Sequence, residues 1–225
     1  MTGTIKIRLS AMMFFEYFIW GAWYVTVGTW LSSSLHFSGQ QVGLVAGTTA
    51  VGATVAPFLV GLIADKFFAT EKVLTFLHIA GAVLLLLASR QTSFALVYSV
   101  LLLYSLCFMP TLALTNSLSF RQMSDPKTEF GAIRVLGTAG WIVAGMLVGS
   151  RGLEATSQPL QLAAAISLLM GLYCLTLPHT PPLARVSNAT STGIFPREAL
   201  SLLKERSMAV FAIASFLICI PLQFY

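Results

Sequence analysis

Charged side chains are scarce in this sequence: 9% of its 225 residues are Asp, Glu, Lys or Arg, whereas 56% are hydrophobic. An ordinary soluble domain carries about 25% charged residues. A water-exposed domain is therefore excluded, because too few charged side chains are available to cover its surface. The net charge is +5, but no loop carries the dense basic patch that nucleic-acid binding requires. We expect no nucleic-acid partner.

Cysteine is also sparse. Cys107, Cys174 and Cys219 all fall in hydrophobic stretches and show no CxxC or Cys/His spacing, so neither a metal site nor a redox site is predicted. The sequence lacks a GxxxxGK[ST] phosphate-binding loop. It also lacks a Ser, His and acid grouping that would indicate a hydrolase. We therefore expect no cofactor and no enzymatic activity.

Long hydrophobic stretches are what the sequence has in abundance. A lipid core about 30 Å thick is crossed by roughly 20 mostly apolar helical residues, and a helix satisfies its own backbone hydrogen bonds there. These stretches predict an all-α membrane protein surrounded by the lipid bilayer. The predicted spans are residues 9–31, 42–64, 73–89, 94–118, 133–149, 160–177 and 208–225.

The basic residues fall almost entirely on one side of these spans. Ten would lie on the side of the amino terminus and only Arg90 and Arg151 on the other, while Arg134 lies within the fifth span. Cytoplasmic loops are enriched in Lys and Arg, so a multi-pass protein with a cytoplasmic amino terminus is predicted. The ten are Lys6, Arg8, Lys66, Lys72, Arg121, Lys127, Arg185, Arg197, Lys204 and Arg206.

The chain divides into three predicted parts. A six-helix amino-terminal bundle occupies residues 1–178, a basic cytoplasmic linker occupies 179–207, and a seventh helix starts in 208–225. This is the layout of a transporter built from two bundles. Because the sequence stops within the seventh span, we expect a truncated chain whose missing carboxy-terminal half is required for transport.

One motif lies between the second and third predicted spans. Residues 61–66 read Gly-Leu-Ile-Ala-Asp-Lys and resemble the Gly-x-Leu-Ala-Asp-Arg/Lys motif of the major facilitator superfamily. Gly61 would permit close helix approach. Asp65 and Lys66 would form a conformational latch, that is, a charge contact that holds one conformation and opens in another. The alternative is a solvated charge pair in a loop.

A narrower resemblance covers nearly the whole chain. Residues 18–23, 108–119, 133–141 and 177–181 resemble, in order and at the matching spans, the nucleoside:proton symporter family of the major facilitator superfamily. This resemblance implies symport of a nucleoside and a proton across a bacterial inner membrane. The alternatives are a major facilitator for a sugar or drug, and a membrane remnant that transports nothing.

The fifth span carries the predicted substrate residues. Arg134, Thr138 and Trp141 are separated by four and three residues, so they share one helical face. The resemblance implies that Arg134 and Thr138 bind the nucleoside and that Trp141, where the family often has Phe, stacks on the base. It also implies that Gln223 contributes an amide. Alternatively, the long side chain of Arg134 reaches the membrane interface.

The first and third spans carry the predicted proton-coupling residues. Glu16 shares a helical face with Trp20 and Trp23. It could carry the proton, pair with Arg134, or reach water near the interface. The two tryptophans could stack on the base or serve as packing residues. His78 could relay a proton or be a hydrogen-bonded structural residue.

Overall fold

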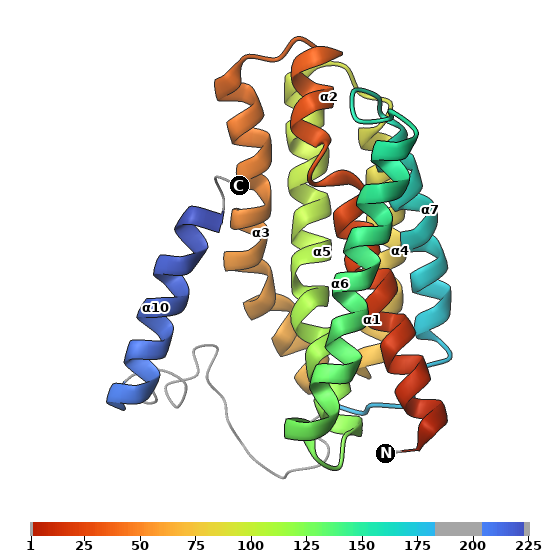
Figure 1. Ribbon diagram of the computed structural model, residues 1–225, viewed down its shortest axis with the longest axis vertical. Helices are drawn as coiled ribbons and strands as arrows, with labels where there is room; N and C mark the ends of the chain where they lie inside the picture. The colour runs from red at the N-terminus through yellow and green to blue at the C-terminus, as the bar shows by residue number, and fades with distance from the viewer. Residues whose placement is uncertain (1, 183–203, 223–225) are drawn as a thin grey trace. The chain divides into compact units, whose positions relative to one another are not determined.

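The structure is a computed structural model that describes residues 2–182 and 204–222. It divides into two compact units, Met1–Ser187 and Asn188–Tyr225, which are described separately (Figure 1). The second contains α10 (Arg206–Leu222). The helices of the first are α1 (Gly3–Trp23), α2 (Val27–Ser33), α3 (Gly39–Lys66), α4 (Thr70–Ala88), α5 (Phe94–Gln122), α6 (Pro126–Ser150) and α7 (Gln158–Cys174).

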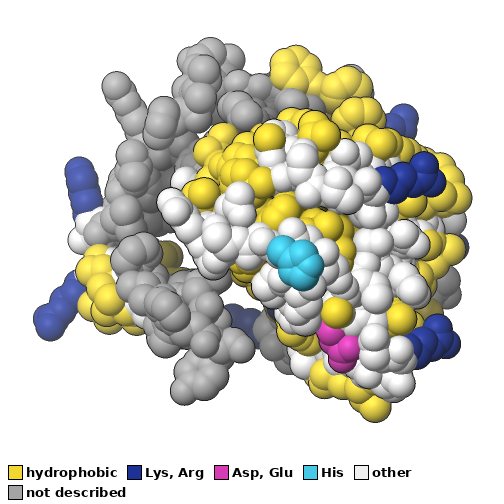
Figure 2. All heavy atoms as spheres, turned by 90° about the horizontal axis from the view of Figure 1, so that it is seen from above, with side chains coloured by type: hydrophobic (Ala, Val, Ile, Leu, Met, Phe, Trp, Pro, Cys, Tyr) yellow, Lys and Arg dark blue, Asp and Glu magenta, His cyan; other side chains and the backbone are white. Residues whose placement is uncertain are grey.

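The helices of the first unit form one bundle. Figure 1 shows consecutive spans running in alternating directions, with α1 and α2 together making the first passage. Within the described part of the chain, α4, α5 and α6 are long and apolar enough to cross a membrane, and α7 is a shorter apolar helix. Seen from above, one end of the bundle carries few charged side chains, and patches of hydrophobic side chains lie along its edge (Figure 2).

The first predicted span differs from the structure in one respect. Residues 9–31 were expected to form a single helix, but α1 ends at Trp23 and α2 begins at Val27. In the turn between them, the Thr26 hydroxyl donates a hydrogen bond to the Trp23 carbonyl at 3.4 Å. Such bonds compete with the helical backbone pattern, and hydrophobicity alone does not locate them.

Glycines allow the helices of the bundle to pack closely. The main helix pairs are α1 with α6, α3 with α5, and α4 with α7. A Cβ atom at Gly140 would lie only 2.1 Å from the Phe14 carbonyl oxygen, and one at Gly52 only 2.6 Å from the Ser105 carbonyl oxygen. The backbones of α1 and α6 are therefore in direct contact, which brings side chains of both helices together beside the contact.

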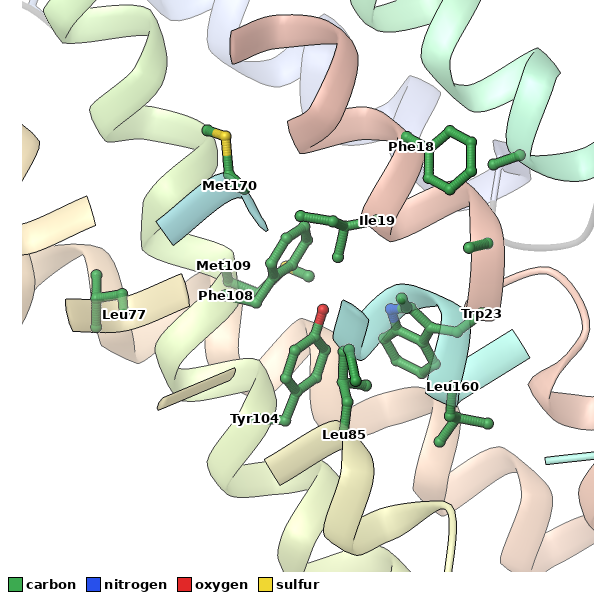
Figure 3. Packing of buried hydrophobic residues seen from close by; sticks show 14 of the residues in the cluster. Phe18, Ile19, Trp23, Leu77, Leu85, Tyr104, Phe108, Met109, Leu160 and Met170 are labelled. Carbon is green, nitrogen blue, oxygen red and sulfur yellow. The ribbon is translucent and has the colours of Figure 1, made fainter. Parts of the chain in front are cut away.

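Aromatic rings fill the core between α1 and α5. The Trp23 ring meets Tyr104 edge-on at 5.3 Å, and Tyr104 stacks on Phe108 at 5.4 Å. Figure 3 shows Leu85 and Leu160 beside this group. In contrast, the outer faces of the helices expose large apolar side chains such as Phe76, which is 71% exposed. An apolar outer surface of this kind is suited to lipid.

The segment that follows α7 is hydrogen-bonded to the first turn of α4 and to the end of α5. The buried carboxylate of Glu71, in the first turn of α4, accepts a hydrogen bond from the Thr180 backbone at 3.0 Å and contacts His179 Nδ1 at 2.7 Å. Arg121, at the end of α5, donates to the Pro181 carbonyl at 2.6 Å. The chain leaving α7 is thus fixed against α4 and α5.

Candidate functional site

The guanidinium group of Arg134 lies over an aromatic ring of the neighbouring helix. Its Cζ atom is 4.0 Å from the centre of the Tyr17 ring, and both side chains are half-buried. A cation over an aromatic face is attracted by the ring quadrupole. Among the side chains that the structure describes, which do not include Asp65, no carboxylate forms an ion pair with Arg134. Tyr17 therefore holds the arginine in place without neutralising its charge.

Two tryptophans extend this arrangement. Trp20 of α1 meets Trp141 of α6 edge-to-face, with ring centres 5.4 Å apart, and lies 6.2 Å from Tyr17. Trp20 Nε1 is buried and has no hydrogen-bond partner among the described residues. Thr138, one turn before Trp141 on α6, is exposed. We call Tyr17, Trp20, Arg134, Thr138 and Trp141 the aromatic–arginine face.

Trp23 lies away from this face. Its side chain is only 1% exposed, and its ring packs edge-on against Tyr104 in the core (Figure 3). The structure thus separates the two tryptophans of α1. Trp20 contacts Trp141 of α6, which is predicted to bind substrate, whereas Trp23 packs in the core.

A second group of polar side chains lies at the centre of the bundle. Glu16 Oε2 is 3.0 Å from His78 Nε2, and both side chains are fully inaccessible to solvent. The other carboxylate oxygen, Oε1, accepts a hydrogen bond from the Thr111 hydroxyl at 2.6 Å. Neither Oε2 nor Nε2 has a hydrogen-bond partner among the described residues, since their 3.0 Å contact is close but not aligned as a hydrogen bond. The two residues predicted to couple transport to protons are therefore in direct contact.

A fourth helix joins this group through Ser167. The Ser167 hydroxyl donates to the His78 carbonyl at 2.9 Å and lies 3.4 Å from His78 Nδ1. We call Glu16, His78, Thr111 and Ser167 the buried polar network. Its members come from α1, α4, α5 and α7, so it connects four helices of the bundle.

The predicted pairing of Glu16 with Arg134 is not found in this conformation. Glu16 contacts His78 and Thr111 instead, and Arg134 contacts Tyr17. The reason is helical geometry, because adjacent residues of an α-helix point about 100° apart. Glu16 therefore projects into the bundle core while Tyr17 projects toward α6.

Three residues of these two groups were not predicted from sequence. Tyr17 stands between Glu16 and Phe18 in an aromatic run, and nothing in that run distinguishes a ring under an arginine from a packing residue. Thr111 and Ser167 are hydroxyl residues in apolar spans, where the usual partner is a carbonyl of the same helix. Only the packing of helices far apart in sequence gives them their partners.

The remaining predicted residues stay as predictions. The 61–66 motif was expected in a loop, but the helical backbone of α3 continues to Lys66. The side chains of Asp65 and Lys66 lie outside the described part of the structure, as does Gln223. Neither the latch nor the amide contact is therefore tested.

Comparisons with known proteins agree with one another. A family model described as nucleoside H+ symporter matches residues 3–225. The "Putative nucleoside transporter YegT" of Escherichia coli (strain K12) is 42% identical over 97% of this chain and 52% of its own length. The xanthosine permease of the same organism is 36% identical over 98% of this chain and 54% of its own length.

A solved structure extends the comparison to the fold. The crystal structure of the nucleoside transporter NupG superposes with a TM-score of 0.80 and 33% identity, over 95% of this chain and 54% of that one. The chain spans about half the length of the curated relatives it matches. The predicted fold class is confirmed: an all-α, multi-pass membrane protein with a major facilitator six-helix amino-terminal bundle and most of a seventh helix.

Proposed function

This chain belongs to the nucleoside H+ symporter family, which is a family of transporters and not of enzymes, and we propose that it forms the amino-terminal bundle of a transporter that moves a nucleoside together with a proton. The two bundles of such a transporter would expose a central site alternately to each side of the membrane. The observation that carries the proposal is Arg134, which lies over Tyr17 beside an aromatic pair and forms no ion pair with a described carboxylate, in a chain that the family model matches over residues 3–225.

The aromatic–arginine face supplies the chemistry that a nucleoside needs. A nucleoside combines a flat base with a polar sugar, so an aromatic wall and hydrogen-bond donors suit its two parts. Trp141 and Trp20 would contact the base, while Arg134 and Thr138 would donate to its carbonyl or ribose oxygens. A charged group within a membrane span is costly and is retained where it faces a ligand, a partner or a water-filled cavity. Gln223, which lies outside the described residues, is proposed as a further ligand of the nucleoside.

The buried polar network supplies a proton site. A carboxylate and an imidazole 3.0 Å apart can share or exchange one proton, and both are shielded from bulk water. Of all ordinary side chains, histidine has the pKa nearest neutrality. Glu16 would bind the transported proton, and His78 would pass it on or hold Glu16 in position.

The surroundings of the bundle are also proposed. The positive-inside distribution favours an inner membrane location with a cytoplasmic amino terminus. Asp65 and Lys66 would act with Gly61 as the conformational latch. Transport would require a second bundle, to which the seventh helix belongs.

Nucleoside uptake tests this proposal. Cells that express the complete protein should accumulate at least one radiolabelled nucleoside from a panel of adenosine, uridine, cytidine and xanthosine, in preference to a sugar. Arg134→Ala should weaken nucleoside affinity roughly ten- to a hundred-fold, because a hydrogen bond from a charged group is worth about 1.5–3 kcal/mol. Arg151→Ala is the matched control, since Arg151 is exposed at the far end of the same helix. Unchanged affinity in Arg134→Ala would remove the substrate assignment.

A further inference from the structure

The hydroxyl of Thr111 lies between two acceptors at the centre of the bundle. Its Oγ1 atom is 2.6 Å from Glu16 Oε1 and 2.6 Å from the carbonyl oxygen of Phe108. Thr111 and Glu16 are both 0% exposed. A hydroxyl has one hydrogen to donate but two lone pairs that accept. It therefore cannot donate a full hydrogen bond to both oxygens at once.

Each protonation state of Glu16 has its own complete arrangement of these atoms. When Glu16 is a carboxylate, the Thr111 hydroxyl donates to Oε1. When a proton binds at Oε1, the new carboxylic O–H donates to Thr111 Oγ1, and the Thr111 hydrogen turns to the Phe108 carbonyl. The change needs only rotation about the Cβ–Oγ1 bond. No heavy atom has to move, and no proton leaves Thr111.

The other carboxylate oxygen is not disturbed by this exchange. Oε2 faces His78 on α4 at 3.0 Å. The other ionisable groups close to Glu16 are Tyr17 on α1, Tyr104 on α5 and Cys174 on α7, while on α6 Arg134 lies over Tyr17. Ordinary phenols and thiols are neutral near pH 7. Among the described residues, His78 is thus the group in contact with Glu16 that can carry a positive charge, and the permanent charge of Arg134 lies beyond the Tyr17 ring.

We propose that Thr111 is a positioning residue for proton coupling: its hydroxyl reverses its hydrogen bond and so keeps Glu16 Oε1 hydrogen-bonded, at one position, both with and without the transported proton. This inference rests on the proposed role of Glu16 as the proton site. A buried carboxyl group without such a partner would favour one protonation state strongly. A reversible partner keeps both states accessible, as a carrier that loads and releases a proton requires.

Thr111→Val tests the inference, because valine keeps the shape of threonine and removes the hydroxyl. Hydrogen bonds to a charged acceptor are stronger than neutral ones, so the variant loses more in the carboxylate state than in the protonated state. Uptake that needs protonated Glu16 falls as pH rises through the point of deprotonation. In Thr111→Val that fall should move about one pH unit higher, which corresponds to about tenfold in proton affinity.

Matched variants separate this effect from a structural one. Thr111→Ser retains the hydroxyl and should restore the wild-type pH profile. Thr111→Cys carries a weak donor and should shift the profile in the same direction by a smaller amount. This variant tests the inference even if Thr111→Val does not reach the membrane. Thr115→Val is the control: Thr115 is equally buried one turn later, but among the described residues its hydroxyl bonds only carbonyls of its own helix. Its profile should stay at the wild-type pH.

The measurement is the initial rate of uptake, as a function of external pH, of the nucleoside from the panel that the complete protein transports fastest. Profiles of Thr111→Val and Thr111→Cys that coincide with wild type overturn the inference and leave the role of Glu16 standing, provided that Glu16→Gln abolishes uptake driven by a pH gradient. If Glu16→Gln still accumulates nucleoside in response to the gradient, the proton site lies elsewhere, and both the site and the inference fall.

Discussion

At the scale of single residues, the contact with the Tyr17 ring positions the side chain of Arg134. The sequence left two possibilities for this arginine, a substrate cavity or the membrane interface. In the structure the guanidinium group is 4.0 Å from the centre of the Tyr17 ring, so the side chain lies against α1. A planar, delocalised cation suits both an aromatic face and an oxygen-rich ligand. Tyr17 thus holds the group and leaves its outer donors available.

Substitution of Tyr17 should therefore affect nucleoside binding through Arg134. A cation–π contact is worth about 0.5–2 kcal/mol, so Tyr17→Leu should weaken affinity about two- to thirty-fold. Tyr17→Phe keeps the ring and should bind close to wild type. Calorimetric titration of the purified complete protein measures both. Equal affinities for Tyr17→Leu and wild type would show that the ring does not position Arg134.

At the scale of elements, the contact between α1 and α6 brings the candidate substrate residues together. Gly140 lies against the Phe14 backbone, and Gly21 lies against Trp141, whose Cα would be 3.0 Å from an added Cβ. This close backbone contact, the seam between α1 and α6, brings the neighbouring side chains together. Tyr17 contacts Arg134, and Trp20 contacts Trp141. The aromatic–arginine face is thus a consequence of two backbones lying side by side.

Widening this seam should destabilise the bundle. An Ala Cβ at Gly140 would lie 2.1 Å from the Phe14 carbonyl oxygen, and backbone cannot yield as a flexible side chain can. Gly140→Ala should cost about 1–3 kcal/mol or more of stability and lower the unfolding temperature of the detergent-solubilised protein. Gly131→Ala is the matched control on α6, since nothing lies within 4 Å of its added Cβ. Indistinguishable unfolding temperatures for the two variants would contradict this account of the seam.

At the scale of the whole molecule, hydrophobic stretches were sufficient to predict the fold class, because a lipid-spanning helix needs a length and composition that can be counted. Spacing along one helix predicted that Arg134 and Trp141 share a face, and in the structure both contact side chains of α1. Contacts between helices could not be predicted from length and composition. The meeting of Glu16 with His78 and Thr111 depends on how α1, α4 and α5 turn toward one another, and the turn at residues 24–26 depends on local hydrogen bonding.

These two groups would supply the parts that the proposed symport requires. The aromatic–arginine face and the buried polar network both involve α1, through Tyr17 and Trp20 on one side and Glu16 on the other. A proton on Glu16 and a nucleoside at Arg134 would therefore act on the same helix. Two ligands that favour the same conformation of one element are thermodynamically coupled.

Accumulation driven by a pH gradient tests this coupling most directly. The complete protein is reconstituted into liposomes that are acidic outside and alkaline inside, and the internal concentration of a radiolabelled nucleoside is followed. The account predicts that wild-type protein concentrates the nucleoside above its external level, that a protonophore abolishes this, and that Glu16→Gln equilibrates the nucleoside without concentrating it. Concentration of the nucleoside by Glu16→Gln to the wild-type level, or wild-type uptake that ignores the gradient, would contradict it.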